Sequence, residues 1–378
     1  MPLIAIVHPI LKASGGQDYL ALHLARALSA RHNVSLLTAV SASREELGRM
    51  LIGGDLSFSI LRVQLPWVVD FPRGRMERFK KLVGSRLLLS VARSVLQGYD
   101  LVVETQSNSL MPVDACYIHY PSVLPTRPRE GPLMRAYSMA IRWLSKALGG
   151  SACAVIANSK WTAKIIEETL GVEPWVLHPP VDTGFFAKNG GGYEGRRGRI
   201  IATITRITPE KRVEEILRLA SSMRDWSFVI AGFSNPRDPY LRMLQGIREK
   251  MRLSNVFFAL NVPRTRLRKL LQSAKYYLHP PFREHFGISI VEAMASGTPP
   301  IVYRGGGSWT DVVSRLDARL GYRDLGEVPR ILEKIEKDYE RLQEKALMLS
   351  RKFDVKVFEK KALKLADHLL ELRQSKQG

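Results

Sequence analysis

The sequence alternates between apolar runs of strand length and patterns of helical periodicity. LIAIVHP, at residues 3–9, is a short apolar run, and a glycine-containing turn leads from it into the helical pattern YLALHLARALSAR and then into NVSLLTAV. A strand, a helix and a second strand in this order are typical of a parallel sheet. Further strands are expected in FSILRVQL, DLVVETQS, DACYIHYP, CAVIANS and WVLHPP.

The alternation stops at residues 185–199, FFAKNGGGYEGRRGR, where glycines and basic residues replace apolar ones, as in a linker or long turn. It restarts with RIIATITRI, and VEEILRLASSM, WSFVIAGF, NVFFALNV, RLRKLLQSA and YYLHPP continue it. The 378 residues therefore predict an α/β protein with two parallel-sheet domains facing across a cleft, 1–185 and 186–355. A charged helix at about 356–378 is expected to pack back on the first domain. Ligands of such sheets bind beyond the carboxyl ends of the strands.

The composition limits the class of protein. The net charge of +21 favours polyanionic partners, namely nucleic acid, an anionic membrane surface or phosphorylated substrates, without choosing among them. No uncharged apolar run reaches the roughly 18 residues of a spanning helix, and MPLIAIVHPI is interpreted as a first strand rather than a signal peptide. Neither Cys116 nor Cys153 has the CxxC spacing of a zinc site. These features favour a cytoplasmic protein without a disulfide framework.

The stretch PFREHFGISIVEAMASGTPP holds two carboxylates, Glu284 and Glu292, on either side of a glycine turn. A helix is expected after the turn, and the N–H groups of Gly287, Ile288 and Ser289 would lack intrahelical partners and form an anion site. Glu292 would lie roughly 7 Å along the helix axis, where its carboxylate suits a diol such as a ribose. Glu284 would flank the same anion from the loop, and together they fit a nucleotide diphospho-sugar. The spacing alone also fits a capping residue and a solvated helix glutamate.

Together with other stretches, this segment resembles the retaining glycosyltransferases of family 4. Glu284 and Glu292 with FG between them, EAMASGTP after them and a GGG loop downstream carry the resemblance. TRITPEKR resembles the donor-phosphate loop of that family, with Arg206 and Lys211 at its basic pair. The resemblance covers residues 8–313 and implies the GT-B fold, in which two Rossmann-like domains face each other across a cleft.

The resemblance also implies roles for individual residues. Glu292 would bind the ribose and Glu284 the hydroxyls of the transferred sugar, in a transfer usually described as front-face, and neither is assigned as a nucleophile. Arg206 and Lys211 would neutralise the diphosphate, where charge develops on the leaving oxygen, although ordinary surface charge is the alternative for both. Because these cations are present and no DxD motif is, no metal or other cofactor is expected, and the GDP- or UDP-sugar is a co-substrate. The expected catalytic residues are Glu284, His119, Arg206 and Lys211. The expected donor contacts are Gly15, Gly16, Arg206, Lys211, Glu284, Phe286, Gly287, Ile288, Ser289 and Glu292.

CYIHYP resembles a narrower group, the α-mannosyltransferases that extend lipid-linked oligosaccharides, of the GDP-Man:Man3GlcNAc2-PP-dolichol type. In this resemblance His119 faces the sugar near its C6 position, whereas from the residues alone a histidine ending an apolar strand is more often structural. His8, at the end of the first strand, is a further candidate. One departure is GGQD, where Asp18 is shorter than the glutamate of many members, so a role for it is not inferred.

Two segments, 72–96 and 127–148, alternate basic and apolar residues, and the second carries Tyr137 and Trp143. Basic amphipathic segments with aromatic residues bind anionic membrane interfaces. The alternative is a helix that packs its apolar face, Trp143 included, into the domain core. Because the resemblance implies an acceptor on a lipid diphosphate, peripheral association with the cytoplasmic membrane face is expected.

The resulting hypothesis is a retaining hexosyltransferase that moves mannose from GDP-mannose to a lipid-linked or other glycan acceptor. A UDP-sugar-dependent enzyme of the same fold is the alternative within this class. A nucleic-acid-binding protein would account for the net charge of +21 but not for the ordered sugar-nucleotide motifs, so no nucleic-acid partner is expected. A non-catalytic binding protein would not need both glutamates and the basic pair.

Overall fold

In a computed structural model, the chain forms two compact units. One consists of Met1–Pro180 together with Val355–Gly378, and the other of Val181–Asp354. We call them the N-terminal and the C-terminal unit, and the domain boundaries expected from the sequence remain predictions. Residues 188–197 of the expected linker lie outside the described residues. The structure describes residues 1–13, 15–51, 55–65, 77–124, 132–148, 154–187, 198–235, 237–280 and 283–377.

The N-terminal unit is built on a seven-stranded sheet in the order β5-β3-β1-β6-β7-β8-β9. All neighbouring strands in it run parallel, which confirms the prediction from the strand–helix alternation. A separate parallel pair, β2 with β4, was not predicted. The strands are β1 (Leu3–Val7), β2 (Ile10–Leu11), β3 (Asn33–Thr38), β4 (Val40–Ser41), β5 (Ser59–Arg62), β6 (Leu101–Glu104), β7 (Ala115–Ile118), β8 (Ala154–Ala157) and β9 (Trp175–Val176).

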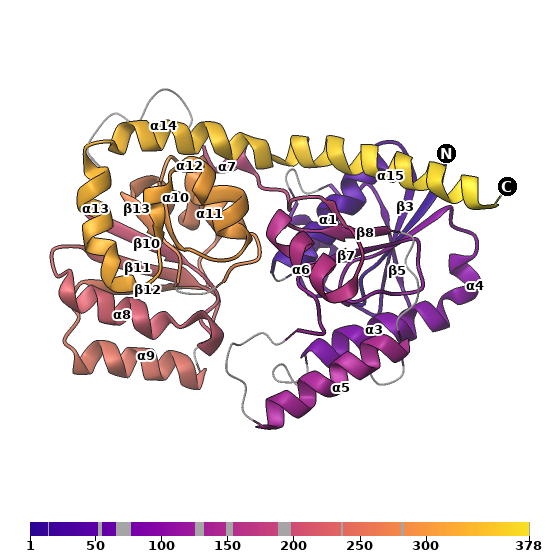
Figure 1. The fold of residues 1–378 in the computed structure, drawn as a ribbon, viewed down its shortest axis with the longest axis horizontal. Helices are drawn as coiled ribbons and strands as arrows, with labels where there is room; N and C mark the ends of the chain where they lie inside the picture. Colours follow the sequence, from indigo (N-terminus) through magenta and orange to yellow (C-terminus); the bar gives the residue numbers. More distant parts are fainter. Residues whose placement is uncertain are drawn as a thin grey trace. The chain divides into compact units, whose positions relative to one another are not determined.

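Helices cover both faces of this sheet (Figure 1), and its central strands are buried and mostly apolar, with Glu104 at the end of β6 as a buried exception. Helices α1 and α15 share one hydrophobic core with the sheet, and α3, α5 and α6 share the other. Two ion pairs help to hold α15 on this unit: Arg26 lies 2.7 Å from Glu359, and Arg373 lies 2.6 Å from Asp114. The helices are α1 (Gly16–Ser29), α2 (Arg44–Gly48), α3 (Glu77–Val91), α4 (Arg93–Leu96), α5 (Pro132–Leu148), α6 (Lys160–Leu170) and α15 (Val355–Gln377).

The C-terminal unit holds a six-stranded parallel sheet in the order β12-β11-β10-β13-β14-β15. Helices α8 and α9 lie on one face and α10 and α11 on the other (Figure 1). The strands are β10 (Ile200–Ile204), β11 (Ser227–Gly232), β12 (Val256–Leu260), β13 (Tyr276–Leu278), β14 (Pro300–Tyr303) and β15 (Gly321–Tyr322). The helices are α7 (Thr183–Phe186), α8 (Val213–Ser222), α9 (Pro239–Lys250), α10 (Arg264–Ser273), α11 (Ile288–Ala295), α12 (Ser314–Leu316), α13 (Val328–Glu336) and α14 (Tyr339–Ser350).

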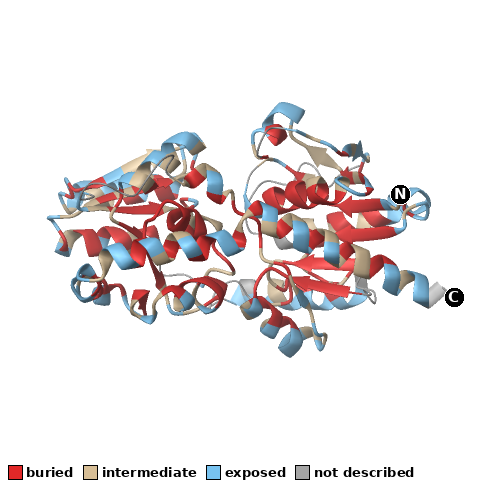
Figure 2. Cartoon of the chain, turned by 90° about the horizontal axis from the view of Figure 1, so that it is seen from above, coloured by how far each residue is buried: buried red, intermediate tan, exposed pale blue. Residues whose placement is uncertain are grey.

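Within each unit the core lies between the sheet and its helices. Figure 2 shows buried residues along the strands and on the inward faces of the helices, and exposed residues on the outward faces. In the described part of the chain, none of the helices has a stretch both long and apolar enough for a membrane span.

The two strands that precede the site motifs are neighbours in the C-terminal sheet. β10 leads into TRITPEKR, β13 leads into the loop with Glu284, and these strands pair in parallel. Because parallel neighbours end at the same edge of a sheet, the two loops leave side by side. This edge is the carboxyl edge, where ligands of such sheets bind.

Candidate active site

The turn from the β13 loop into α11 depends on Gly287. Its φ is 89°, a left-handed conformation that glycine adopts without strain. A Cβ atom at this position would lie 2.5 Å from Ile290 Cδ1 and 3.2 Å from Glu284 Cγ. α11 begins immediately afterwards, so the expected helix start is confirmed. The N–H groups of Ile288 and Ser289 belong to its first turn, where helices attract anions.

Glu284 is held between the helix start and the β10 loop. Lys211 Nζ donates to Glu284 Oε2 at 2.7 Å, and the backbone N–H of His285 donates to Oε1 at 3.2 Å. Burial alone would raise the pKa of Glu284, but the charge of Lys211 and the neighbouring His279 outweigh it and hold the pKa well below its usual range. Glu284 is therefore ionised at neutral pH, and its oxygens only accept hydrogen bonds.

The two expected cations of the β10 loop differ in their surroundings. Lys211 ends a 3-10 helix, Pro209–Lys211, and is 8% exposed, with its ammonium group directed to Glu284. Arg206 lies earlier in the loop, and its side chain is exposed. The structure therefore brings Lys211 together with Glu284 and leaves Arg206 open to solvent or to a ligand.

Glu292 projects from α11 and pairs with a cation that the sequence did not single out. Arg264, at the start of α10, lies 3.3 Å from Glu292 Oε1 and also packs over the rings of Phe185 and Phe186. Burial raises the pKa of Glu292, and Arg264 only partly opposes this shift. Glu292 is thus a confined carboxylate with one cation beside it, and not the solvated helix glutamate of the alternative interpretation.

The glycine-rich loop after β14 supports Glu284 through backbone contacts. Gly306 forms an isolated parallel bridge with Glu284, and Ser308 donates its backbone N–H to the Glu284 carbonyl oxygen at 3.2 Å. The φ of Gly306 is 88°, and a Cβ atom there would lie 2.3 Å from that carbonyl oxygen. Because the backbones of Gly306 and Glu284 approach so closely, only glycine fits at position 306, and the contact holds the backbone of Glu284 in place.

Replacing Gly306 by alanine is expected to displace Glu284 and to destabilise the protein by about 1–3 kcal/mol, because the backbone strain has no flexible neighbour to relieve it. Denaturant unfolding measures the loss. Gly246→Ala is the matched control: Gly246 lies on the exposed face of α9 with no atom within 4 Å of its Cβ position, so alanine should stabilise the protein by up to about 1 kcal/mol. Equal stability of the two variants would contradict the supporting role of Gly306.

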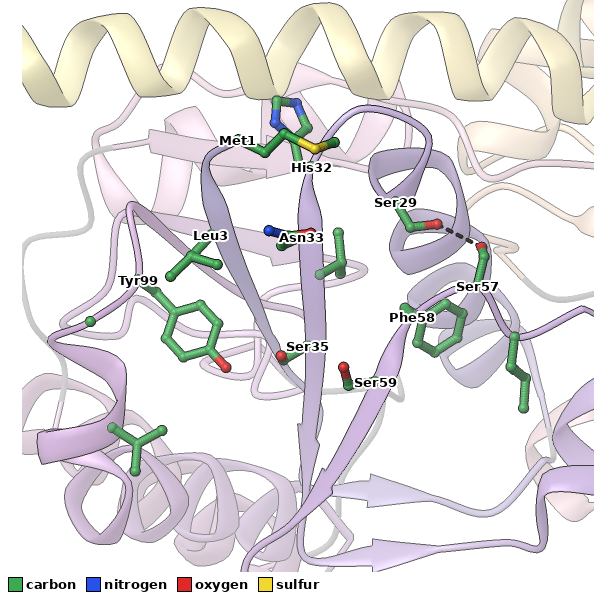
Figure 3. Close-up of a pocket in the computed structure, with 14 residues that line it drawn as sticks. Met1, Leu3, Ser29, His32, Asn33, Ser35, Ser57, Phe58, Ser59 and Tyr99 are labelled. Atoms are coloured by element: carbon green, nitrogen blue, oxygen red, sulfur yellow. Dashed lines mark hydrogen bonds between the residues drawn. The ribbon is translucent and has the colours of Figure 1, made fainter.

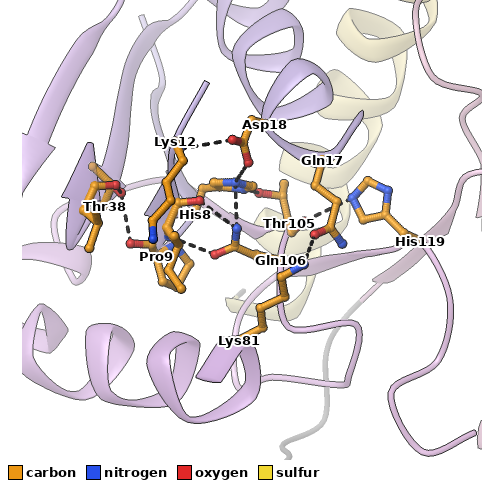
Figure 4. Close-up of polar contacts among 12 residues, drawn as sticks. His8, Pro9, Lys12, Gln17, Asp18, Thr38, Lys81, Thr105, Gln106 and His119 are labelled. Atoms are coloured by element: carbon orange, nitrogen blue, oxygen red, sulfur yellow. Dashed lines mark hydrogen bonds and ion pairs between the residues drawn. The ribbon is translucent and has the colours of Figure 1, made fainter. Parts of the chain in front are cut away.

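In the N-terminal unit, Gly15 and Gly16 lie at the start of α1, both exposed at the carboxyl edge of the sheet. Gly15 has a φ of 99°, and a Cβ there would meet no atom within 4 Å, so the backbone conformation rather than crowding favours glycine. The loop before it is anchored by Asp18, which accepts from the backbone N–H of Lys12 at 3.0 Å and lies 3.1 Å from His8 Nε2 (Figure 4). Asp18, for which no role was inferred from the sequence, is therefore an anchor of the glycine loop.

The two histidine candidates of this unit are joined through Thr105. His8 is completely buried and lies 2.9 Å from Thr105 Oγ1, so it supports the loop rather than meeting a ligand. His119 is partly buried, and its Nε2 lies 3.2 Å from the Thr105 carbonyl oxygen (Figure 4). Since a carbonyl only accepts, Nε2 carries a proton. A sugar contact of His119 remains a prediction.

A hollow of about 730 Å³ lies at the opposite, amino edge of the N-terminal sheet (Figure 3). Leu3, Asn33 and Ser59, which line it, are the first residues of β1, β3 and β5. Because ligands of parallel sheets bind at the carboxyl edge, we do not assign this hollow to the site.

Sequence analysis missed Arg264, Tyr277 and His279. Arg264 belongs to a basic helix that could be read only as surface. Tyr277 and His279 stand two apart in the strand pattern YYLHPP and so share one side of the sheet, which was a usable signal for a buried polar pair. Among the described residues, no group of three or more His, Cys, Asp or Glu lies close enough to hold a metal ion, and independence from metal remains a prediction.

The chain forms two parallel α/β units, and one of them brings together a helix start, a lysine and two carboxylates at the carboxyl edge of its sheet. The fold and this site define a class of protein, namely α/β proteins with a site for a phosphorylated, hydroxyl-rich ligand. Two family models match the chain. The model of "Glycosyltransferase Family 4" matches residues 14–185, and that of "Glycosyl transferases group 1" matches residues 194–342. The chain belongs to these glycosyltransferases, as the sequence motifs predicted.

Several curated relatives carry the name GDP-Man:Man(3)GlcNAc(2)-PP-Dol alpha-1,2-mannosyltransferase. The chain is 30% identical to the one from Candida albicans over 192 residues, which cover 45% of the chain and 31% of that protein. For the one from Dictyostelium discoideum the identity is 24%, covering 68% of the chain and 59% of that protein. For the human protein it is 22%, covering 89% and 78%. The chain thus matches less than two thirds of the length of each of these first two relatives.

Solved structures share the fold over almost the whole chain. Sucrose-phosphate synthase from Thermosynechococcus elongatus has a TM-score of 0.77 at 16% identity, covering 98% of this chain and 100% of that one. An Anabaena protein in complex with UDP and glucose has a TM-score of 0.69 at 14% identity, covering 97% and 100%. At such identities the likeness establishes the GT-B fold alone.

Proposed function

We propose that the protein is a retaining hexosyltransferase that transfers mannose from GDP-mannose to a lipid-linked glycan. The observation that carries this proposal is the Lys211–Glu284 ion pair at the start of α11, within the group 1 glycosyltransferase domain. The donor and the acceptor are taken from the names of the relatives. Since the mannose of GDP-mannose is α-linked, transfer into an α-linkage retains its configuration.

In this proposal the donor diphosphate lies at the N-terminus of α11. The N–H groups of Ile288 and Ser289 face its oxygens, and Lys211 and Arg206 supply positive charge where the leaving oxygen gains negative charge. Lys211 has three N–H donors, so it can bridge Glu284 and the diphosphate. Fixed donors and cations in a partly buried site stabilise the transition state without reorganising at the moment of bond cleavage.

Glu284 in this proposal accepts hydrogen bonds from the hydroxyls of the mannose. Its low pKa makes it a poor proton donor, so it cannot act as a general acid near neutral pH. Glu292 accepts from the two ribose hydroxyls, and Arg264 orients its carboxylate from the other side. The two carboxylates would thus fix both ends of the nucleotide-sugar while the cations act at its centre.

The full chain is tested by incubation with GDP-mannose and a dolichol-diphosphate oligosaccharide, with UDP-glucose and UDP-N-acetylglucosamine in parallel. We expect GDP-mannose to be consumed at least about tenfold faster, a difference worth about 1.4 kcal/mol. The product should be sensitive to α-mannosidase. Faster use of a UDP-sugar would establish the alternative donor, and no release of nucleotide from any donor would refute the enzyme assignment.

We also propose that the N-terminal unit binds an anionic membrane surface through α5. Leu133, Met139 and Trp143 are 73%, 69% and 70% exposed. By helix geometry they form one stripe, and the exposed Arg135 and Arg142 run along its edge. Trp143 therefore lies outside the core, contrary to the alternative expected from the sequence. An exposed apolar stripe with a basic border fits the headgroup region of a bilayer.

Replacing Trp143 by serine is expected to reduce binding to vesicles of phosphatidylcholine and phosphatidylserine about tenfold, because the largest apolar side chain of the stripe is lost. Flotation at low salt measures the bound fraction. The wild type should bind these vesicles better than pure phosphatidylcholine vesicles, and high salt should weaken binding. Trp226→Phe is the control, since Trp226 lies in the C-terminal unit, partly buried against its core. Equal flotation of both variants would contradict the proposal.

A further inference from the structure

Two buried polar side chains connect Glu284 to the first turn of α11. Tyr277 is completely buried and His279 is 2% exposed, and their rings stack at 6.2 Å. The Tyr277 hydroxyl lies 2.9 Å from Ser289 Oγ, 3.2 Å from His279 Nδ1 and 3.1 Å from the carbonyl oxygen of Ile204. On the other side of the ring, His279 Nε2 lies 3.4 Å from Glu284 Oε2. A continuous row of polar groups thus runs from Ser289 to Glu284.

The location of the protons follows from the chemistry of the two ends. Glu284 is a carboxylate, so it only accepts, and a bare imidazole nitrogen facing it would be repelled. Nε2 of His279 therefore carries a proton directed at Oε2. Burial lowers the pKa of His279, which makes the ring neutral and leaves Nδ1 as an acceptor. The single proton of the Tyr277 hydroxyl is then shared between Nδ1 and the Ile204 carbonyl oxygen. His285, with its pKa lowered to about 4 by burial, adds no charge at neutral pH.

Glu284 Oε2 has two neighbours of different kinds. Lys211 is close, at 2.7 Å. His279 Nε2 is at 3.4 Å, which is an ion-pair distance but too long for a hydrogen bond, and Nε2 has no hydrogen-bond partner among the described residues. Lys211 is also the cation that the donor diphosphate would attract. When Lys211 shares its N–H groups with that diphosphate, its hold on Oε2 weakens, and Nε2 of His279, 3.4 Å away, is within reach to donate a hydrogen bond to Oε2. Hydrogen bonds of this kind are often long before substrate binds and shorten afterwards.

Resting on the proposed function, we propose that His279 is a positioning residue for Glu284. Its Nε2–H group holds the carboxylate in place while Lys211 is drawn to the donor diphosphate, and Tyr277 fixes the ring and links it to Ser289. The arrangement couples occupation of the helix N-terminus to the orientation of the carboxylate that meets the sugar.

Three substitutions at His279 separate this role from simple packing. Glutamine places an amide N–H group near Nε2, asparagine places one near Nδ1, and leucine fills the space without either. We expect kcat to fall about tenfold to thirtyfold in His279→Leu and His279→Asn, with the Kd for GDP changed by less than about threefold, as for the loss of one hydrogen bond to a charged group. His279→Gln should recover about tenfold of the kcat lost in His279→Leu.

A second measurement does not depend on the donor. The groups that lower the pKa of Glu284 are Lys211, His279 and His285. Removing the Nε2 donor should move the pKa of Glu284 upward, toward that of the unfolded chain, so the fall of the melting temperature below about pH 4 should be smaller in His279→Leu than in His279→Gln. Tyr277→Phe, which keeps the ring and removes the hydroxyl, should lower kcat less than His279→Leu.

The outcomes distinguish the two levels of the proposal. If the wild type does not use GDP-mannose, the proposed function fails. The acid limb, meaning the fall of the melting temperature with decreasing pH, still tests the role of His279. If the wild type is active but His279→Gln is no better than His279→Leu and His279→Asn, the positioning role is refuted. Coincident acid limbs in His279→Leu and His279→Gln would refute it as well.

Discussion

Replacing Lys211 by methionine is expected to lower kcat for mannose transfer about 10²–10³-fold, because one fixed cation is removed from the position where charge develops on the leaving diphosphate. The fold should survive, since methionine fills the same space and Glu284 keeps the backbone N–H of His285 and partial contact with water. Steady-state kinetics with GDP-mannose measure the loss. Lys250→Met, at the exposed end of α9, is the control and should leave kcat unchanged.

The same variant has a predicted pH signature. A carboxyl group whose pKa is lowered in the folded state adds stability above its unfolded pKa of about 4.3, and that stability is lost as the pH falls through the folded pKa. In Lys211→Met the pKa of Glu284 should rise toward its ordinary value. The contribution of Glu284 to acid sensitivity should therefore shrink, so below about pH 4 the melting temperature of Lys211→Met should fall less than that of the wild type. A variant with full activity and an unchanged acid limb would rule out the assigned role of Lys211.

The strand and helix types were largely predictable because each unit repeats a buried apolar strand and an amphipathic helix. YYLHPP followed by a glycine turn gave β13 and α11, since the short apolar run, the prolines and the glycine each act locally. β2, β4 and β15 were not predicted as separate strands, because a pair of residues carries no periodicity of its own. β9 is equally short and was found only as part of the longer run WVLHPP. The order of strands also escaped prediction, since pairing depends on packing between distant segments.

The contact between Lys211 and Glu284 shows where sequence reasoning ends. The two residues are 73 positions apart, and only the pairing of β10 with β13 places their loops at one edge. The resemblance to a family placed Lys211 and Glu284 in one site, whereas the spacing of the two residues in the sequence did not. Arg264 is a clearer limit. It is one of four basic residues in its helix, and only the packed structure shows that this one lies beside a buried carboxylate.

Gly306 and Asp18 show a second limit. Both were visible in the sequence, one in a glycine-rich loop and one as a departure from a family pattern. Their roles depend on atoms that approach from elsewhere: the Glu284 carbonyl oxygen for Gly306, and His8 for Asp18. A residue type indicates that a backbone is crowded or that a carboxylate is available, but its partner is fixed only by the tertiary structure.

Replacing Glu292 by alanine is expected to raise the KM for GDP-mannose about tenfold to hundredfold, because two hydrogen bonds from ribose hydroxyls to a charged acceptor are lost. Since these bonds also help to place the diphosphate, kcat should fall as well. Kinetics over a range of GDP-mannose concentrations measure both effects, and calorimetry with GDP measures binding without the sugar. Glu292→Gln, which keeps one acceptor oxygen, should lose less affinity than Glu292→Ala.

The stability of Glu292→Gln distinguishes a ligand-binding role from a structural one. Burial raises the pKa of Glu292, so the folded state holds its proton to higher pH than the unfolded chain does, and stability falls as the pH rises through that window. At pH 7 the ionised carboxylate is therefore a cost to folding, and Arg264, which is about a third exposed, can be hydrated when the charge is removed. The melting temperature of Glu292→Gln at pH 7 should be no lower than that of the wild type, and any gain should disappear below about pH 4. A loss of activity that tracks a loss of stability would show instead that Glu292 holds the fold together and does not bind the nucleotide.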